Sequence, residues 1–144
     1  MKPVRAEITL RNVEDEFRVK EGHIKEEEIR QVTVEALVDT HAWTLVINEA
    51  LREKLGLDVT ETEPATLADG TMVAYNVAGP IEVKWKNRRT ICEALVLPDI
   101  EDVLLGAIPL EAMDLTVDPE KGELAGVHGN QMMHNDAELS GNRD

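Results

Sequence analysis

Short runs with a two-residue period of apolar and polar positions, separated by turn residues, dominate the chain. The clearest run is 29–38, where three valines and Ala36 share one face and mostly polar residues share the other. Leu37 interrupts the polar face, which predicts that this strand is buried on both faces near its end. Further strands are expected at 4–10, 65–68, 71–77, 81–86, 90–97, 103–105, 115–117 and 123–125.

Turn residues between these runs predict two hairpins in the middle of the chain. Asp69-Gly70 is a strong signal for a two-residue turn. Asn87-Arg88-Arg89 has the length of a second hairpin turn. Between the two hairpins, Gly79-Pro80 is expected to break the strand.

Helical signals are confined to two short segments. Asn48 can cap a helix in which Leu51 and Leu55 lie on one face, and Gly56 supplies its end. Residues 109–113 add a single helical turn. The predicted fold class is therefore all-β, that is, mainly β with one or two short helices.

Length and composition are those of a single domain with an aliphatic core. The chain has 144 residues, of which 42% are hydrophobic and only 3% aromatic, so Val, Leu, Ile and Ala must build the core. We place the domain at residues 1–127. Residues 128–144 are polar and without periodicity, which predicts a disordered C-terminal tail.

The charge of the chain narrows the classes of partner. Fifteen basic and 29 acidic residues give a net charge of −14, which argues against nucleic acid because phosphate backbones are repelled. No apolar stretch approaches the roughly 20 residues that cross a bilayer, and the N-terminus lacks the hydrophobic core of a secretory signal. We therefore expect a cytoplasmic protein with no membrane and no nucleic-acid partner.

Residues suited to metal or redox chemistry are few. Cys92 is the single cysteine, so an internal disulfide is excluded. His23, His128 and His134 lie in polar loops or in the tail without the spacing of metal ligands. No metal site and no cofactor are expected.

One carboxylate stands out by its position. Asp39 directly follows the apolar end of the strand 29–38. Burial penalises the ionised form of a carboxyl group, so such an Asp is either hydrogen-bonded for structural reasons or tuned for proton chemistry.

The surroundings of Asp39 favour the second interpretation. Asp39-Thr40-His41-Ala42 is followed downstream by the apolar run 103–107 with its Gly106, and then by a short helical segment. Between them, Leu67-Ala68-Asp69-Gly70-Thr71 has the place and character of a flap hairpin. The order and spacing of these three elements resemble the retropepsin-like (clan AA) aspartic peptidases of the small microbial type, over roughly residues 32–126. Asp-Thr-His here replaces the family's Asp-Thr-Gly.

This resemblance implies a fold, a reaction and a partner. The fold would be a closed barrel equivalent to half of an acid protease, and the reaction hydrolysis of peptide bonds by two carboxylates that share one proton. Because only Asp39 lies in the right context, the second carboxylate would be Asp39 of a second copy in a homodimer. The segments 4–10 and 123–127 are expected to pair across that interface. The implied catalytic residues are Asp39 and Thr40; the implied peptide-binding residues are His41, Ala42, Ala68, Asp69, Gly70, Thr71, Leu105 and Gly106.

His41 is the departure that leaves the activity open. Glycine at this position leaves room for the substrate backbone, whereas an imidazole obstructs it, forces a changed backbone angle or places a positive charge beside the carboxylates. Impaired or narrowed peptidase activity is one interpretation, and participation of His41 in catalysis is another. The alternative function is a non-catalytic module of the same fold that dimerises and binds extended peptide segments.

Overall fold

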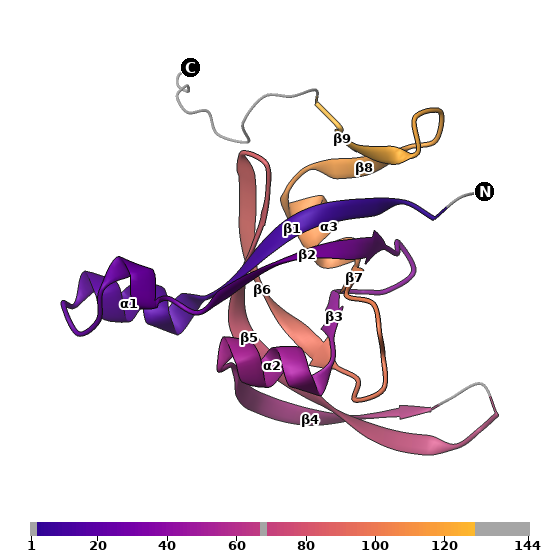
Figure 1. Ribbon diagram of the computed structural model, residues 1–144. Helices are drawn as coiled ribbons and strands as arrows, with labels where there is room; N and C mark the ends of the chain where they lie inside the picture. The colour runs from indigo at the N-terminus through magenta and orange to yellow at the C-terminus, as the bar shows by residue number, and fades with distance from the viewer. Residues whose placement is uncertain (1–2, 67–68, 129–144) are drawn as a thin grey trace.

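The structure, a computed structural model, describes residues 3–66 and 69–128. Within these ranges the chain is mainly β, with short helices between strands (Figure 1), so the predicted fold class is confirmed. The elements are β1 (Arg5–Asn12), α1 (Val13–Lys20), the 3-10 turn η1 (Glu26–Glu28), β2 (Gln31–Val38), β3 (Leu45–Ile47), α2 (Glu49–Leu55), β4 (Asp58–Thr66), β5 (Met72–Trp85), β6 (Arg88–Val96), β7 (Leu104–Leu105), α3 (Ala107–Ala112), β8 (Leu115–Asp118) and β9 (Glu123–Gly126).

The main sheet closes on itself. Its strand order is β1-β2-β7-β3-β6-β5-β4, and β1 also pairs with β5, which joins the two sides and leaves β4 outside the ring. β8 and β9 form a separate two-stranded hairpin. β1 pairs with β2 from Arg5 to Arg11 and with β5 from Thr9 to Asn12. Within segment 4–10, only Thr9 and Leu10 are paired with strands on both sides, and the expected pairing of this segment with a second copy stays a prediction.

β5 is the strand that links the barrel to the projecting hairpin (Figure 1). Its first half pairs with β4 up to Gly79, and its second half pairs with β1 from Ile81 onward. The register with β6 shifts between Ala78 and Ile81. Gly79-Pro80 thus bends a continuous strand through a bulge and does not break it, contrary to the sequence prediction.

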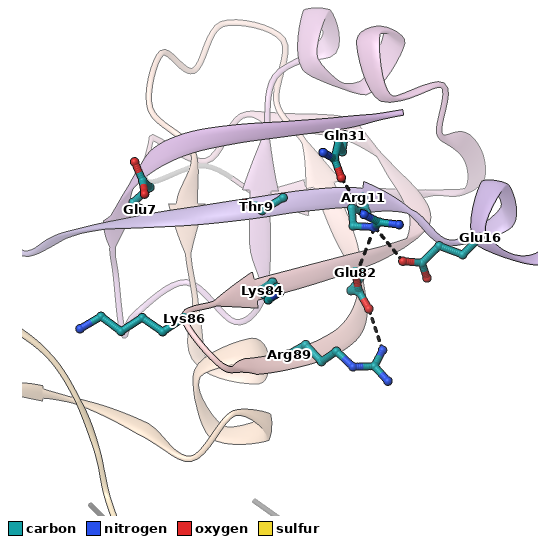
Figure 2. A pocket seen from close by; sticks show the side chains of 9 residues that line it. All are labelled: Glu7, Thr9, Arg11, Glu16, Gln31, Glu82, Lys84, Lys86 and Arg89. Carbon is teal, nitrogen blue, oxygen red and sulfur yellow. Dashed lines mark hydrogen bonds and ion pairs between the residues drawn. The ribbon is translucent and has the colours of Figure 1, made fainter. Parts of the chain in front are cut away.

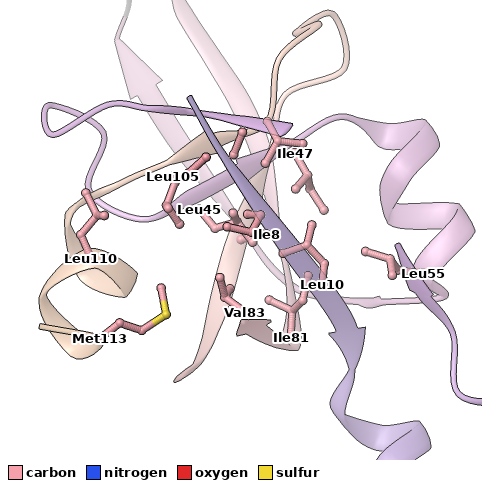
Figure 3. Packing of buried hydrophobic residues seen from close by; sticks show 14 of the residues in the cluster. Ile8, Leu10, Leu45, Ile47, Leu55, Ile81, Val83, Leu105, Leu110 and Met113 are labelled. Atoms are coloured by element: carbon pink, nitrogen blue, oxygen red, sulfur yellow. The ribbon is translucent and has the colours of Figure 1, made fainter. Parts of the chain in front are cut away.

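The core is aliphatic, as composition predicts. Leu10, Leu45, Ile47, Ile81 and Leu105 are completely buried and come from four different strands (Figure 3). The strand β2 contributes little to it except Ala36, because its valines are only partly buried. α2 has the predicted caps: the side chain of Asn48 accepts the N–H of Leu51, and Gly56 adopts the left-handed conformation.

Helix α1 was not predicted. Asn12 caps it, because its Oδ1 accepts the N–H of Asp15 at 2.9 Å, and its Nδ2 donates to Leu55 O at 2.8 Å. The helix buries only Val13 and Asp15, so it has no apolar stripe to reveal it in the sequence.

A buried carboxylate attaches α1 to the start of β2. The Asp15 side chain is 3% exposed and accepts hydrogen bonds from Arg30 Nε at 2.9 Å, from the Arg30 backbone N–H at 3.0 Å and from Arg18 at 2.6 Å. The hydrogen bond from the Arg30 side chain outweighs the cost of burial and holds the pKa of Asp15 far below its ordinary value.

The turn between β5 and β6 also differs from the prediction. It consists of Lys86 and Asn87, whereas Arg88 already belongs to β6. The Arg88 side chain is buried and donates to the carbonyls of Met113 and Asp114 at the end of α3. Because an arginine is rarely buried, the sequence gives no signal for this position of Arg88 inside a strand.

Candidate active site

Asp39 lies where β2 leaves the barrel beside β7. These strands are parallel, with Val38 opposite Leu105, and the Asp39 N–H donates to Leu105 O at 3.0 Å. The chain then turns sharply, since the Ala42 N–H donates back to Asp39 O at 3.1 Å. The Asp39 side chain is 35% exposed. It is therefore a carboxylate at the rim of the barrel and not a buried structural one.

The loop after Asp39 crosses the loop after β7 at very short range. Ala107 N–H donates to Ala42 O at 2.8 Å, and Ile108 N–H donates to Trp43 O at 2.9 Å. A Cβ on Gly106 would lie 2.2 Å from Thr44 O and 2.5 Å from Ala42 O. Only glycine fits at this crossing, which explains the glycine after Leu105. The structure brings Leu105, Gly106 and Ala42 beside Asp39, as the sequence predicts.

The Asp39 carboxylate is oriented by its own loop. Oδ1 accepts the backbone N–H of His41 at 2.9 Å. Among the described residues, no hydrogen bond to Oδ2 is present. One oxygen is thus held by the backbone, and the other is available to a water or a ligand.

Thr40 and His41 both reach solvent. Thr40 is exposed, and the His41 side chain is 98% exposed, with Nδ1 3.8 Å from Asp39 Oδ1. In the part of the chain that the structure describes, the non-glycine residues with positive φ are Lys86 and Asp114. His41 therefore does not have a left-handed backbone, and a backbone angle changed by the imidazole stays a prediction.

The predicted flap corresponds to the β4–β5 hairpin. Pairing ends at Thr66 opposite Met72, so Thr71, which was expected in a strand, precedes β5. Asp69 Oδ1 accepts the Thr71 N–H at 2.9 Å, and Gly70 has a φ of 87°. Hydrogen bonds from Thr71 lower the pKa of Asp69. Ala68, which was also predicted to bind peptide, lies outside the described residues.

An apolar surface joins the Asp39 loop to the hairpin. Val46, Val77 and Leu95 are buried together, and the partly buried side chains of Ala42, Tyr75, Leu97, Ile100 and Leu104 pack against them. Tyr75 and Val77 belong to β5, whereas Ala42 belongs to the loop after Asp39. This arrangement can support an extended peptide between the carboxylate and the hairpin.

Two half-exposed apolar residues flank the site. Trp43 is 49% exposed and Ile108 is 45% exposed, and the backbone hydrogen bond between them keeps them adjacent. Ile108 was missed by sequence reasoning. The sequence could have revealed it, because an apolar residue in the first turn of a helix this short has no face on which to be buried.

Metal chemistry has no visible basis in the described ranges 3–66 and 69–128. No group of three His, Cys, Asp or Glu side chains there could hold a metal ion. In the same ranges, no helix has the length and apolar character needed to cross a membrane.

Comparison with known protein families identifies the family of the chain. Residues 26–107, more than half of the chain, match the model of a family described as aspartyl protease. The matched span contains the Asp39 loop, the β4–β5 hairpin and the Leu105-Gly106 crossing. No curated protein matches the chain.

Proposed function

The chain belongs to the aspartyl protease family, and on this premise we propose that it is a retropepsin-like aspartic endopeptidase that acts as a homodimer. One observation carries the proposal. The exposed Asp39 carboxylate stands at the crossing of two loops that Gly106 allows to approach, with Oδ1 held by the His41 N–H.

The chemistry requires a second carboxylate. Two facing Asp groups share one proton, because like charges about 3 Å apart do not both ionise. The ionised group takes a proton from the water as the water oxygen attacks the peptide carbonyl. The protonated group gives its proton to the carbonyl oxygen, so the pair is restored when the intermediate collapses. We propose that the second group is Asp39 of a second copy, related by two-fold symmetry.

The remaining residues of the site have positioning roles in this proposal. Thr40 would contact its counterpart and hold the two loops together. Leu105 and Gly106 would hold the Asp39 loop in place where the two loops cross. The hairpin residues Asp69, Gly70 and Thr71, together with Ala68, would cover a peptide that lies as an extended strand.

Asparagine at position 39 tests this proposal directly. Asp39→Asn keeps the shape of the side chain but cannot accept the water proton, so cleavage of a peptide library should be abolished. Wild-type cleavage should be greatest on the acidic side of neutrality. Asp99→Asn, at an exposed position in a turn, is the matched control and should cleave like wild type. Undiminished cleavage by Asp39→Asn would assign the activity to another site.

The oligomeric state is a second, independent test. Analytical ultracentrifugation at high micromolar concentration should show a dimer. A strict monomer under these conditions would refute the shared-carboxylate mechanism, because one carboxyl group cannot both activate the water and protonate the carbonyl.

A second function is favoured by His41. Its imidazole is fully exposed beside Asp39, where a peptide would have to pass. If this imidazole prevents cleavage, the protein is a dimeric module that binds extended peptides on the apolar surface between Ala42 and β5 without cutting them. Peptide binding without cleavage, unchanged by Asp39→Asn, would support this alternative.

A further inference from the structure

Positive charge is concentrated at one end of the β5–β6 hairpin, although the chain carries a net charge of −14. Four of the 15 basic residues fall within the six positions 84–89. Arg88 is buried against the end of α3. Lys84, Lys86 and Arg89 are exposed, and we call these three residues the basic patch.

The basic patch borders a pocket of about 490 Å³ on the outer face of β1, β5 and β6 (Figure 2). Lys84 lies directly opposite Arg89 in the β5–β6 register and opposite Thr9 of β1. Like charges at directly opposed positions of an antiparallel pair are destabilising. This pairing therefore favours a bound anion that lies between them.

The basic residues that line the pocket outnumber the acidic ones, so the lining is not fully neutralised: Arg11, Lys84, Lys86 and Arg89 against Glu7, Glu16 and Glu82. Glu82 is almost completely buried and accepts from Arg89 at 2.7 Å, and it lies 3.6 Å from Arg11 Nε. Arg11 also binds Glu16 at 2.9 Å, so Glu16 and Glu82 are occupied by arginines (Figure 2). In the described part of the chain, Lys84 and Lys86 make no ion pair. The Lys86 ammonium instead lies 4.6 Å from the centre of the Trp85 ring.

The pocket is separate from the candidate active site. The β4–β5 hairpin lies at the N-terminal end of the long strand β5, whereas the basic patch lies at its C-terminal end. A ligand there would not need the Asp39 carboxylate.

We propose that this pocket is a docking site for an acidic segment of a partner protein. Carboxylate side chains spaced along a short peptide can reach Lys84, Lys86 and the outer face of Arg89 together. A nucleic acid is disfavoured, because its long phosphate backbone would also meet the strongly negative remainder of the surface. The site does not depend on the proposed peptidase activity.

A fluorescent oligo-glutamate peptide is the probe, and its anisotropy with the full chain is the measurement. We expect binding at about 0.05 M salt that is lost at about 1 M salt, where charges are screened within a few ångströms. The double variant Lys84→Gln/Lys86→Gln should weaken binding by roughly tenfold or more. Lys54→Gln/Lys121→Gln removes two exposed lysines from other faces and should bind like wild type.

Three results with oligo-glutamate would overturn the proposal. They are no binding of oligo-glutamate to the wild-type chain, equal weakening in the two double variants, or binding that salt does not change. Tighter binding of a single-stranded oligonucleotide that competes with the peptide would also overturn it, since it would assign the patch to nucleic acid. Circular dichroism spectra identical to wild type would show that the variants are folded.

Discussion

Gly106→Ala should be among the most damaging single-atom additions to this protein. The φ of Gly106 is −97°, a value that alanine adopts readily, so the backbone conformation does not disfavour the substitution. The added Cβ, however, would lie 2.2 Å from Thr44 O and 2.5 Å from Ala42 O. Ordinary contact needs a displacement of the two loops by about 1 Å.

The cost follows from the contacts that such a displacement breaks. The hydrogen bonds from Ala107 to Ala42 and from Ile108 to Trp43, at 2.8 and 2.9 Å, would be stretched beyond hydrogen-bond range. Two hydrogen bonds contribute about 1–3 kcal/mol, and overpacking adds about 1–3 kcal/mol. The expected loss is about 2–6 kcal/mol out of a total unfolding free energy of about 5–15 kcal/mol.

Urea unfolding and amide hydrogen exchange test this reasoning. The amides of Ala107 and Ile108 should exchange faster in the variant. Gly22→Ala is the control: it introduces alanine at a φ of +80° with no atom within 4 Å of the new Cβ, and should cost about 1–2 kcal/mol. The steric argument fails if Gly106→Ala unfolds within about 1 kcal/mol of wild type, or costs less than Gly22→Ala.

Three further predictions follow from other residues. Asp15→Asn should destabilise the fold by about 1.5–3 kcal/mol in urea unfolding, because it weakens the hydrogen bonds from Arg30 and Arg18, whose side chains themselves remain solvated. Since Arg30 lowers the pKa of Asp15, this contribution is present above the unfolded pKa of about 4 and is lost as the pH falls through the folded pKa. The stability gap between wild type and Asp15→Asn should therefore narrow below about pH 4, and a gap independent of pH would contradict the assignment. Burial raises the pKa of the partly buried Cys92 thiol to about 11, so iodoacetamide should label the folded protein at pH 8 far more slowly than the urea-unfolded protein; equal rates would be inconsistent with a raised pKa. His41→Gly should increase peptide cleavage, because the imidazole no longer stands in the path of the substrate. Reduced cleavage would make His41 a participant, and a variant inert at every pH would favour the binding module.

The local elements of this fold could be predicted from the sequence because single residues specify them. Asn48 and Gly56 delimit α2 through side-chain and backbone preferences that act within the helix itself. The alternation in 29–38 fixed β2 in the same way. The position of Asp39 after a strand was sufficient to single it out.

What sequence reading missed depends on partners distant along the chain. α1 is held by Asp15, whose counter-ion Arg30 follows fifteen residues later, and not by an apolar face. The bend at Gly79-Pro80 makes sense only because β5 exchanges β4 for β1 as its neighbour there. The strand β7 was expected at 103–105, but its insertion between β2 and β3 was not, because that insertion is a property of the whole sheet.

The insertion of β7 also sets the order in which the site can be completed. Leu104 pairs with Leu37 and Val46, which lie far earlier in the chain, so the neighbourhood of Asp39 is closed by one of the most non-local contacts of the fold. During synthesis, β2 and the Asp39 loop emerge long before their support exists. A nascent chain that ends before Leu104 contains Asp39 but lacks the strand that supports its loop. Asp39 therefore cannot act until most of the polypeptide has been made.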